Sequence, residues 1–123
     1  MPDIVAIAHH AADAERTPVE AQRLVAGRPL QAVANAYSSG DDAFHCGIWE
    51  GDVGAWQVRY SEHELCHMLA GRIRITGEDG SIREYAAGNS FVIPAGFRGV
   101  WEVIEPARKL YAVYEPQTER VAS

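Results

Sequence analysis

The chain has 123 residues, of which 47% are hydrophobic, and its formal net charge is -6 at pH 7. This length and this hydrophobic content allow one domain with one core and exclude a compositionally disordered chain. The negative charge, without any run of lysine and arginine, argues against a general nucleic-acid or anionic-membrane binder. We therefore expect no nucleic-acid partner and no membrane partner.

The start of the chain and its cysteines indicate a reducing compartment. Residues 1–4 lack a basic segment followed by a long apolar run, so they predict neither a secretion signal nor a membrane helix. Cys46 and Cys66 form neither a disulfide framework nor a CxxC pair. These features predict a cytoplasmic protein.

Residues 1–29 are expected to form a tail and one short helix. Thr17 and Glu20 fit a capping box, and Pro18 suits the first helical turn. Gly27, shortly before Pro29, is typical of a helix end. The pattern predicts a helix over residues 17–27.

From residue 30 onward the pattern predicts β-strands. Between residues 72 and 76, Ile73 and Ile75 alternate with polar residues, which is typical of a strand with one buried face. Many short strands at such spacing predict an all-β sandwich or small barrel over residues 30–116, followed by a C-terminal tail at 117–123. The expected connections lie at residues 38–42, 51–54, 77–80 and 87–89.

Residues 61–71 allow two incompatible interpretations. As a helix, His63-Glu64-x-x-His67 would match the H-E-x-x-H zinc pattern, which also needs a third ligand. The nearest candidates for that ligand, His45, Glu78 and Glu84, stand at no diagnostic spacing. As a strand, the segment would place Glu64 and His67 on opposite faces. Strand-like runs flank the segment directly and leave no room for a connection, so we favour the strand.

A second motif supports the strand. Gly88, followed after five residues by Pro94-Ala95-Gly96, matches the start of the second cupin motif, and Glu64 with Gly71 matches the first. With Trp49, Trp101 and Lys109 in order, the chain resembles the cupin group of ureidoglycine aminohydrolase-like and ethanolamine-utilisation proteins. The resemblance implies an RmlC-like cupin fold, which is a jelly-roll β-barrel, and usually a homodimer. It also implies a small-molecule ligand.

The same resemblance implies that the usual cupin metal ligands are missing. The two histidines expected before Glu64 are replaced by Val58 and Tyr60, or by Gln57 and Arg59 in another register, and the later histidine by Gly99. One carboxylate cannot replace three imidazoles, because metal affinity and geometry depend on the number of ligands. We expect no metal and no other cofactor, unless His45, His63 or His67 rebuilds a site.

Strand alternation predicts a pocket around Glu64. Burial among aromatic rings would raise the pKa of this carboxyl unless Tyr60, Arg98 or Lys109 holds its charge. Glu64 and Tyr60 are the candidate catalytic residues. The candidate ligand-binding residues are Trp56, Val58, Phe91, Arg98, Gly99, Trp101, Lys109 and Tyr111.

Three functions fit such a pocket. The first is a metal-free cupin acting on or binding a small nitrogen-containing or carboxylate metabolite, a ligand class that the resemblance alone implies. The second is a non-catalytic ligand-binding or sensing domain. The third is a metal-dependent enzyme that uses His63 or His67. These patterns fit an enzyme and a binding domain alike.

Overall fold

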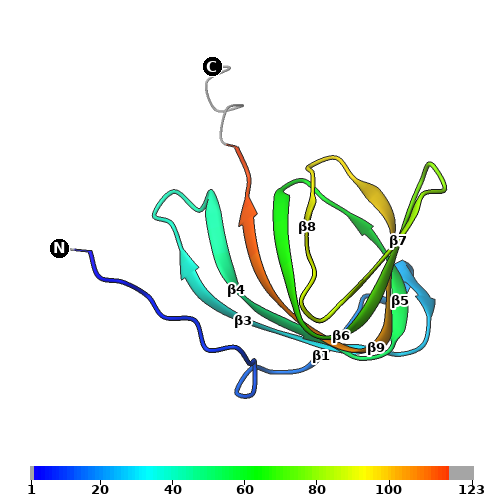
Figure 1. Ribbon diagram of the computed structural model, residues 1–123, viewed down its shortest axis with the longest axis horizontal. Coiled ribbons are helices and arrows are strands. Elements are labelled where there is room, and N and C mark those ends of the chain that lie inside the picture. The colour runs from blue at the N-terminus through cyan, green and yellow to red at the C-terminus, as the bar shows by residue number, and fades with distance from the viewer. Residues whose placement is uncertain (1, 117–123) are drawn as a thin grey trace.

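Two long strands, β6 (His63–Gly77) and β9 (Arg98–Tyr114), run antiparallel through the whole structure and organise it (Figure 1). The computed structural model describes residues 2–116. The strands form a nine-stranded sheet that curls strongly, so that one face lines an interior (Figure 1). The remaining strands are β1 (Thr17–Pro18), β2 (Leu24–Ala26), β3 (Leu30–Ser38), β4 (Phe44–Gly51), β5 (Gly54–Arg59), β7 (Ile82–Ala86) and β8 (Ser90–Ile93).

Each long strand pairs with different neighbours along its two halves. The first half of β9 pairs with β5 and the second half with β4, while β6 lies along the other side of β9 throughout. On its free side, β6 pairs first with β8 and then with β7. The sheet then extends from β4 to β3 and β1, and from β5 to β2. This shared pairing makes the two halves one continuous curved wall.

The curvature is sharpest where β6 passes Gly71. The register between β6 and β9 shifts three times between Met68 and Ile73. Gly71 has a φ of 82°, and a Cβ atom at this position would overlap the backbone carbonyl of Pro106 on β9. The bend therefore needs both the positive φ and the absent side chain of glycine.

Strand alternation places the residues of β6 on two faces. Glu64, Cys66 and Met68 are buried inside, whereas Leu65 is 45% exposed on the outside. The strand interpretation of residues 61–71 is thus confirmed. The helical interpretation, which the H-E-x-x-H zinc pattern requires, is wrong, because ladder bonds to β8 and β9 hold this segment extended.

The expected helix over residues 17–27 is wrong. Only a short 3-10 helix forms, η1 (Ala21–Arg23), between β1 and β2. Thr17 pairs with Gln31 on β3, and Leu24 pairs with Trp56 on β5. Backbone pairing with the sheet here outweighs the local capping signal, which is worth only about 1 kcal/mol.

The residues before β1 form an arm that packs on the outside of the sheet. Glu50 on β4 accepts a hydrogen bond from the Ala11 amide at 2.9 Å, and its cross-strand partner Arg108 donates one to the His9 carbonyl at 3.0 Å. Ala11 is buried against Ile48. Two charged residues of the sheet therefore fix a segment that the sequence patterns left as a tail.

No helix within residues 2–116 is long and apolar enough to cross a membrane. The connections expected at 38–42, 51–54, 77–80 and 87–89 fall between consecutive strands, as predicted. The C-terminal tail expected at 117–123 lies outside the described residues.

Gly71→Ala tests the bend, with Gly80→Ala as a matched control. Both glycines have positive φ, but an added Cβ at Gly80 meets no atom within 4 Å. The control should lose about 1–2 kcal/mol for the left-handed backbone, and Gly71→Ala should lose at least about 1 kcal/mol more from the overlap with Pro106. Urea unfolding measures both losses. Equal losses would show that the close approach to Pro106 does not shape the bend.

Candidate functional site

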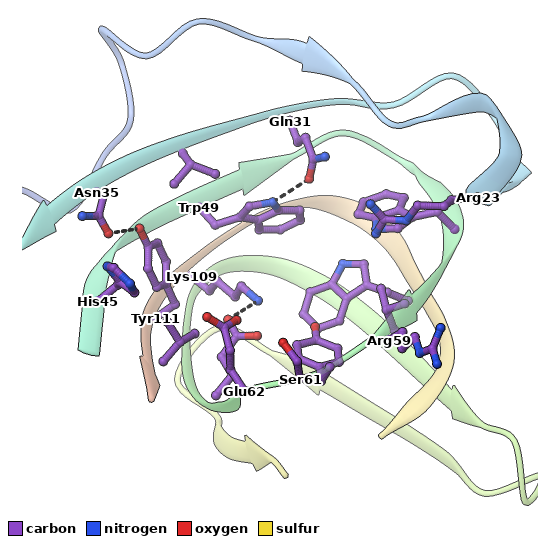
Figure 2. A pocket seen from close by; sticks show the side chains of 17 residues that line it. Arg23, Gln31, Asn35, His45, Trp49, Arg59, Ser61, Glu62, Lys109 and Tyr111 are labelled. Atoms are coloured by element: carbon purple, nitrogen blue, oxygen red, sulfur yellow. Dashed lines mark hydrogen bonds and ion pairs between the residues drawn. The ribbon is translucent and has the colours of Figure 1, made fainter. Parts of the chain in front are cut away.

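The concave face of the sheet holds a pocket of about 480 Å³. Its walls come from β3, β4, β5, β6 and β9, and from the connection between β5 and β6 (Figure 2). The three tryptophans of the chain, Trp49, Trp56 and Trp101, all line it. A cavity of this size with aromatic walls and a few polar groups is typical of small-molecule sites.

A buried ion pair forms the floor of the pocket. The Lys109 ammonium lies 2.8 Å from Oε2 of Glu64, and the two residues are only 5% and 6% exposed (Figure 2). Glu64 and Lys109 project from β6 and β9, where strand alternation turns both side chains inward. Lys109 is also the only lysine of the chain. The charge that the sequence placed at Glu64 is therefore held by Lys109, and not by Arg98.

Aromatic and sulfur groups complete the surroundings of the Lys109 ammonium. Its nitrogen lies 4.3 Å from the Trp101 ring centroid and 5.3 Å from that of Trp49. It also donates to Sγ of Cys66 at 3.6 Å. Ring faces attract a cation more strongly where water is excluded, so these contacts offset part of the cost of burying the charge.

Lys109, Tyr60 and Cys66 all have raised pKa values in this environment. Burial is the largest single influence and lowers the pKa of Lys109, but the attraction of Glu64, Cys66 and Tyr60 and the hydrogen bond to Glu64 together outweigh it, so the pKa is raised. Burial raises the pKa of Tyr60 and takes the pKa of the Cys66 thiol to about 12. Because the folded-state pKa of Lys109 exceeds the usual 10.5, the pair stabilises the fold fully below that pH. This stabilisation is lost as the pH rises through the folded-state pKa.

Two side-chain hydrogen bonds fix aromatic residues in the walls of the pocket. The indole nitrogen of Trp49 donates to Oε1 of Gln31 at 2.9 Å, and the hydroxyl of Tyr111 donates to Oδ1 of Asn35 at 2.6 Å (Figure 2). Burial raises the pKa of Tyr111 to about 12. Gln31 and Asn35 both belong to β3, so this strand holds the orientation of aromatic groups on β4 and β9.

The mouth of the pocket carries charges of both signs. Arg23 and Arg59 lie on one side of it and His45 lies on the opposite side (Figure 2). Burial, followed by repulsion from Glu115 and Glu64, raises the pKa of Glu62 at the rim. His45 is held by a 2.7 Å hydrogen bond to Ser38 and a 3.0 Å contact with the Asp42 carbonyl.

Most of the residues proposed from the sequence meet around this pocket, and three do not. Phe91 stacks on Tyr85 with ring centroids 4.0 Å apart and does not line it. Arg98 and Gly99 line a second hollow next to it. The candidates that do line it are Tyr60, Glu64, Trp56, Val58, Trp101, Lys109 and Tyr111.

Several lining residues were missed by sequence reasoning. Trp49 and His45 are four residues apart in β4, so strand alternation places both on the same face. The inward position of Trp49 could therefore have been predicted from the sequence. Gln31 and Asn35 were not accessible, because their role depends on the pairing of β3 with β4. Arg23 was assigned to a helix that does not form.

The residues at the expected cupin metal positions do not fit a metal ion. Glu64 is already neutralised by an ammonium group, and Val58, Tyr60 and Gly99 supply no imidazole. His63 and His67 project from the opposite face of β6, where His63 accepts from the Ala95 amide and His67 contacts Ser90. Within residues 2–116, no three His, Cys, Asp or Glu side chains are grouped to hold a metal.

A double-variant cycle tests the ion pair. Glu64→Gln and Lys109→Met should each cost about 3–5 kcal/mol of unfolding free energy, because each leaves one buried charge unpaired. The double variant should lose no more than either single variant, because no unpaired charge remains, giving a coupling energy of at least about 3 kcal/mol in urea unfolding.

The outward-facing pair of Arg74 and Glu84 serves as the control. These side chains are 38% and 40% exposed, so their coupling should stay below about 1 kcal/mol. Additive losses for Glu64 and Lys109 would mean that the pair does not stabilise the floor.

The fold of this chain is similar to that of several solved structures. The chain is similar to EutQ of Clostridium difficile, with a TM-score of 0.63 and 18% identity over 72% of this chain and 65% of that one. It is also similar to a DUF861-family protein of unknown function from Pseudomonas syringae pv. tomato, with a TM-score of 0.71 and 22% identity over 81% and 44%. A DUF861-family protein from Thermotoga maritima is 38% identical over 52% of this chain and 73% of that one, with a TM-score of 0.51.

These similarities confirm the expected cupin fold. The chain spans 65% and 44% of the first two of these proteins, which is less than two thirds of each. Curated proteins give no match. The EutQ-like cupin domain matches residues 38–111, which is more than half of the chain, and the chain therefore belongs to this family of cupins.

Proposed function

We propose that this cupin binds a small metabolite in the pocket above Glu64 and Lys109, without a metal and without catalysing a reaction. The ligand class expected from the resemblance, a nitrogen-containing or carboxylate metabolite, suits a floor that carries one cation and one anion. Gln31 and Asn35 add amide groups at the rim that can pair with polar atoms of such a ligand. Aromatic walls supply the contact area.

The observation that favours binding over catalysis is the ion pair of Glu64 and Lys109, in which each charge already has a partner at 2.8 Å. Lys109 and Tyr60 both have raised pKa values, so neither exchanges protons readily near neutral pH. General acid–base catalysis works best with a group whose pKa lies near the operating pH. Glu64 faces an ammonium only 2.8 Å away, which stabilises the carboxylate in place. Such a pair orients a ligand more readily than it transfers a proton.

Tryptophan fluorescence tests this function, because all three tryptophans line the pocket. In a panel of small amines, ureides and carboxylic acids, at least one compound should change the fluorescence in a saturable way. Val58→Phe should weaken its binding by about tenfold or more, because the larger ring fills part of the cavity. Val53→Phe, in the exposed turn before β5, is the matched control and should bind as the wild type does.

Turnover separates binding from catalysis. Mass spectrometry should recover the bound compound unchanged. If it is consumed, and Tyr60→Phe abolishes consumption while binding persists, the acid–base enzyme replaces our proposal. Consumption that requires added metal and is lost in His63→Ala or His67→Ala would favour the metal-dependent enzyme. Binding that is unaffected by Val58→Phe would place the ligand elsewhere.

We also propose that two copies of the chain associate through the outer face of the sheet. Leu65 lies beside Val92 on β8 and Ala112 on β9, and Phe44 lies beside Tyr114. Four of these five side chains are among the large exposed apolar ones, and none is charged. Two chains, each of net charge -6, can therefore meet here without bringing like charges together. Sedimentation equilibrium should give a dimer, and Leu65→Asp a monomer. The cytoplasmic location stays a prediction.

A further inference from the structure

Two arginines face each other directly across neighbouring strands. Arg59 at the end of β5 pairs in register with Arg98 at the start of β9. Residues directly opposite in an antiparallel pair project to the same side, so their guanidinium groups share one side of the sheet. Like charges in this arrangement destabilise a sheet unless a counter-charge lies nearby. The arrangement therefore calls for an anion.

In the described part of the chain, no carboxylate forms an ion pair with either arginine. Arg74 on β6, by contrast, contacts Glu84 at 2.9 Å and Glu102 at 3.0 Å. Within residues 2–116, neither Arg59 nor Arg98 forms an ion pair or a side-chain hydrogen bond. This is notable in a chain with 17 acidic residues and only 11 basic ones.

The two arginines line a hollow of about 740 Å³, together with Arg23. Arg23 is held in place by a 3.1 Å hydrogen bond from its Nε to the Gln57 carbonyl and lies 3.7 Å from Glu20. Among residues 2–116, Glu78 is the one carboxylate that lines this hollow. The residues that line the hollow therefore carry a net of two positive charges, although Glu20 outside the hollow is paired with Arg23.

The hollow adjoins the aromatic pocket. Arg23, Val58 and Arg59 line both spaces. Figure 2 shows Arg23 and Arg59 together on the same side of the pocket, away from Asn35 and His45. The hollow therefore borders the pocket along Arg23, Val58 and Arg59.

We propose that Arg59 and Arg98, assisted by Arg23, bind an anionic group of the ligand, either a carboxylate or a phosphate. The planar guanidinium fork matches both groups through paired hydrogen bonds, and charge-assisted bonds of this kind are stronger than neutral ones. The site narrows the ligand of the proposed function to a small organic anion. This inference rests on the proposed function for the part of the ligand that lies in the aromatic pocket, whereas binding of a free anion does not depend on that function.

Anion capture is tested with isotope-labelled protein titrated by inorganic phosphate, and separately by acetate, at constant ionic strength. Heteronuclear NMR should show saturable shifts at the Nε–H groups and amides of Arg59 and Arg98. Arg59→Gln and Arg98→Gln should each weaken binding by about tenfold, which is about 1.4 kcal/mol, because each removes charge-assisted hydrogen bonds to the anion. Arg83→Gln on β7 is the control, since Arg83 lines neither space, and should bind as the wild type does.

The two anions distinguish the kinds of ligand. Saturation by phosphate alone assigns the site to phosphate, and saturation by acetate alone assigns it to carboxylates. Shifts that do not saturate with either anion, that spread equally to Arg83, or that survive both substitutions would overturn the proposal. The indole N–H signals of the three tryptophans report the pocket separately. Failure of anion capture is therefore distinguishable from failure of ligand binding in the pocket.

Discussion

The buried pair of Glu64 and Lys109 is the interaction on which the site depends. Neither charge could remain inside the sheet alone, because an isolated buried charge costs several kcal/mol. At 2.8 Å, each compensates the other, and Trp49 and Trp101 shield the ammonium from water. Where the expected metal-binding histidines are replaced, the carboxylate of the first cupin motif is instead paired with an ammonium group from β9. The positive charge that compensates Glu64 is therefore a side chain of the protein itself.

The fold delivers this pair through the register of its two long strands. Glu64 lies opposite Val113 and Met68 lies opposite Lys109. The Lys109 side chain therefore extends along β9 towards Val113 to reach the carboxylate of Glu64. Beyond the bend at Gly71, the second half of β6 pairs with the first half of β9, and Ile73 and Trp101 are buried there. A change in register of one residue would turn every inward group to the outside. The site is therefore as well fixed as the pairing of β6 with β9.

Local patterns in the sequence were sufficient for the strands but not for their partners. The alternation of Ile73 and Ile75, and the glycine turns, predicted the elements after residue 30 because burial of one face leaves a period of two. The capping pattern at Thr17 predicted a helix wrongly, because a local pattern carries no information about the pairing of this residue with β3. Lys109 was one of three possible partners for Glu64, since choosing among them required the pairing of β6 with β9. The separation of Arg98 from the pocket also depended on which face its strand presents.

The central claim is that Lys109 remains a charged group inside the protein. As the only lysine of the chain, it gives a single signal in NMR of lysine-labelled protein, so its titration can be followed without assignment. We predict that the ammonium keeps its proton as the pH passes the usual lysine pKa of 10.5, for as long as the protein stays folded. A Lys109 signal that titrates at or below 10.5 in the folded protein would contradict the account, because the pair with Glu64 would then not hold the charge.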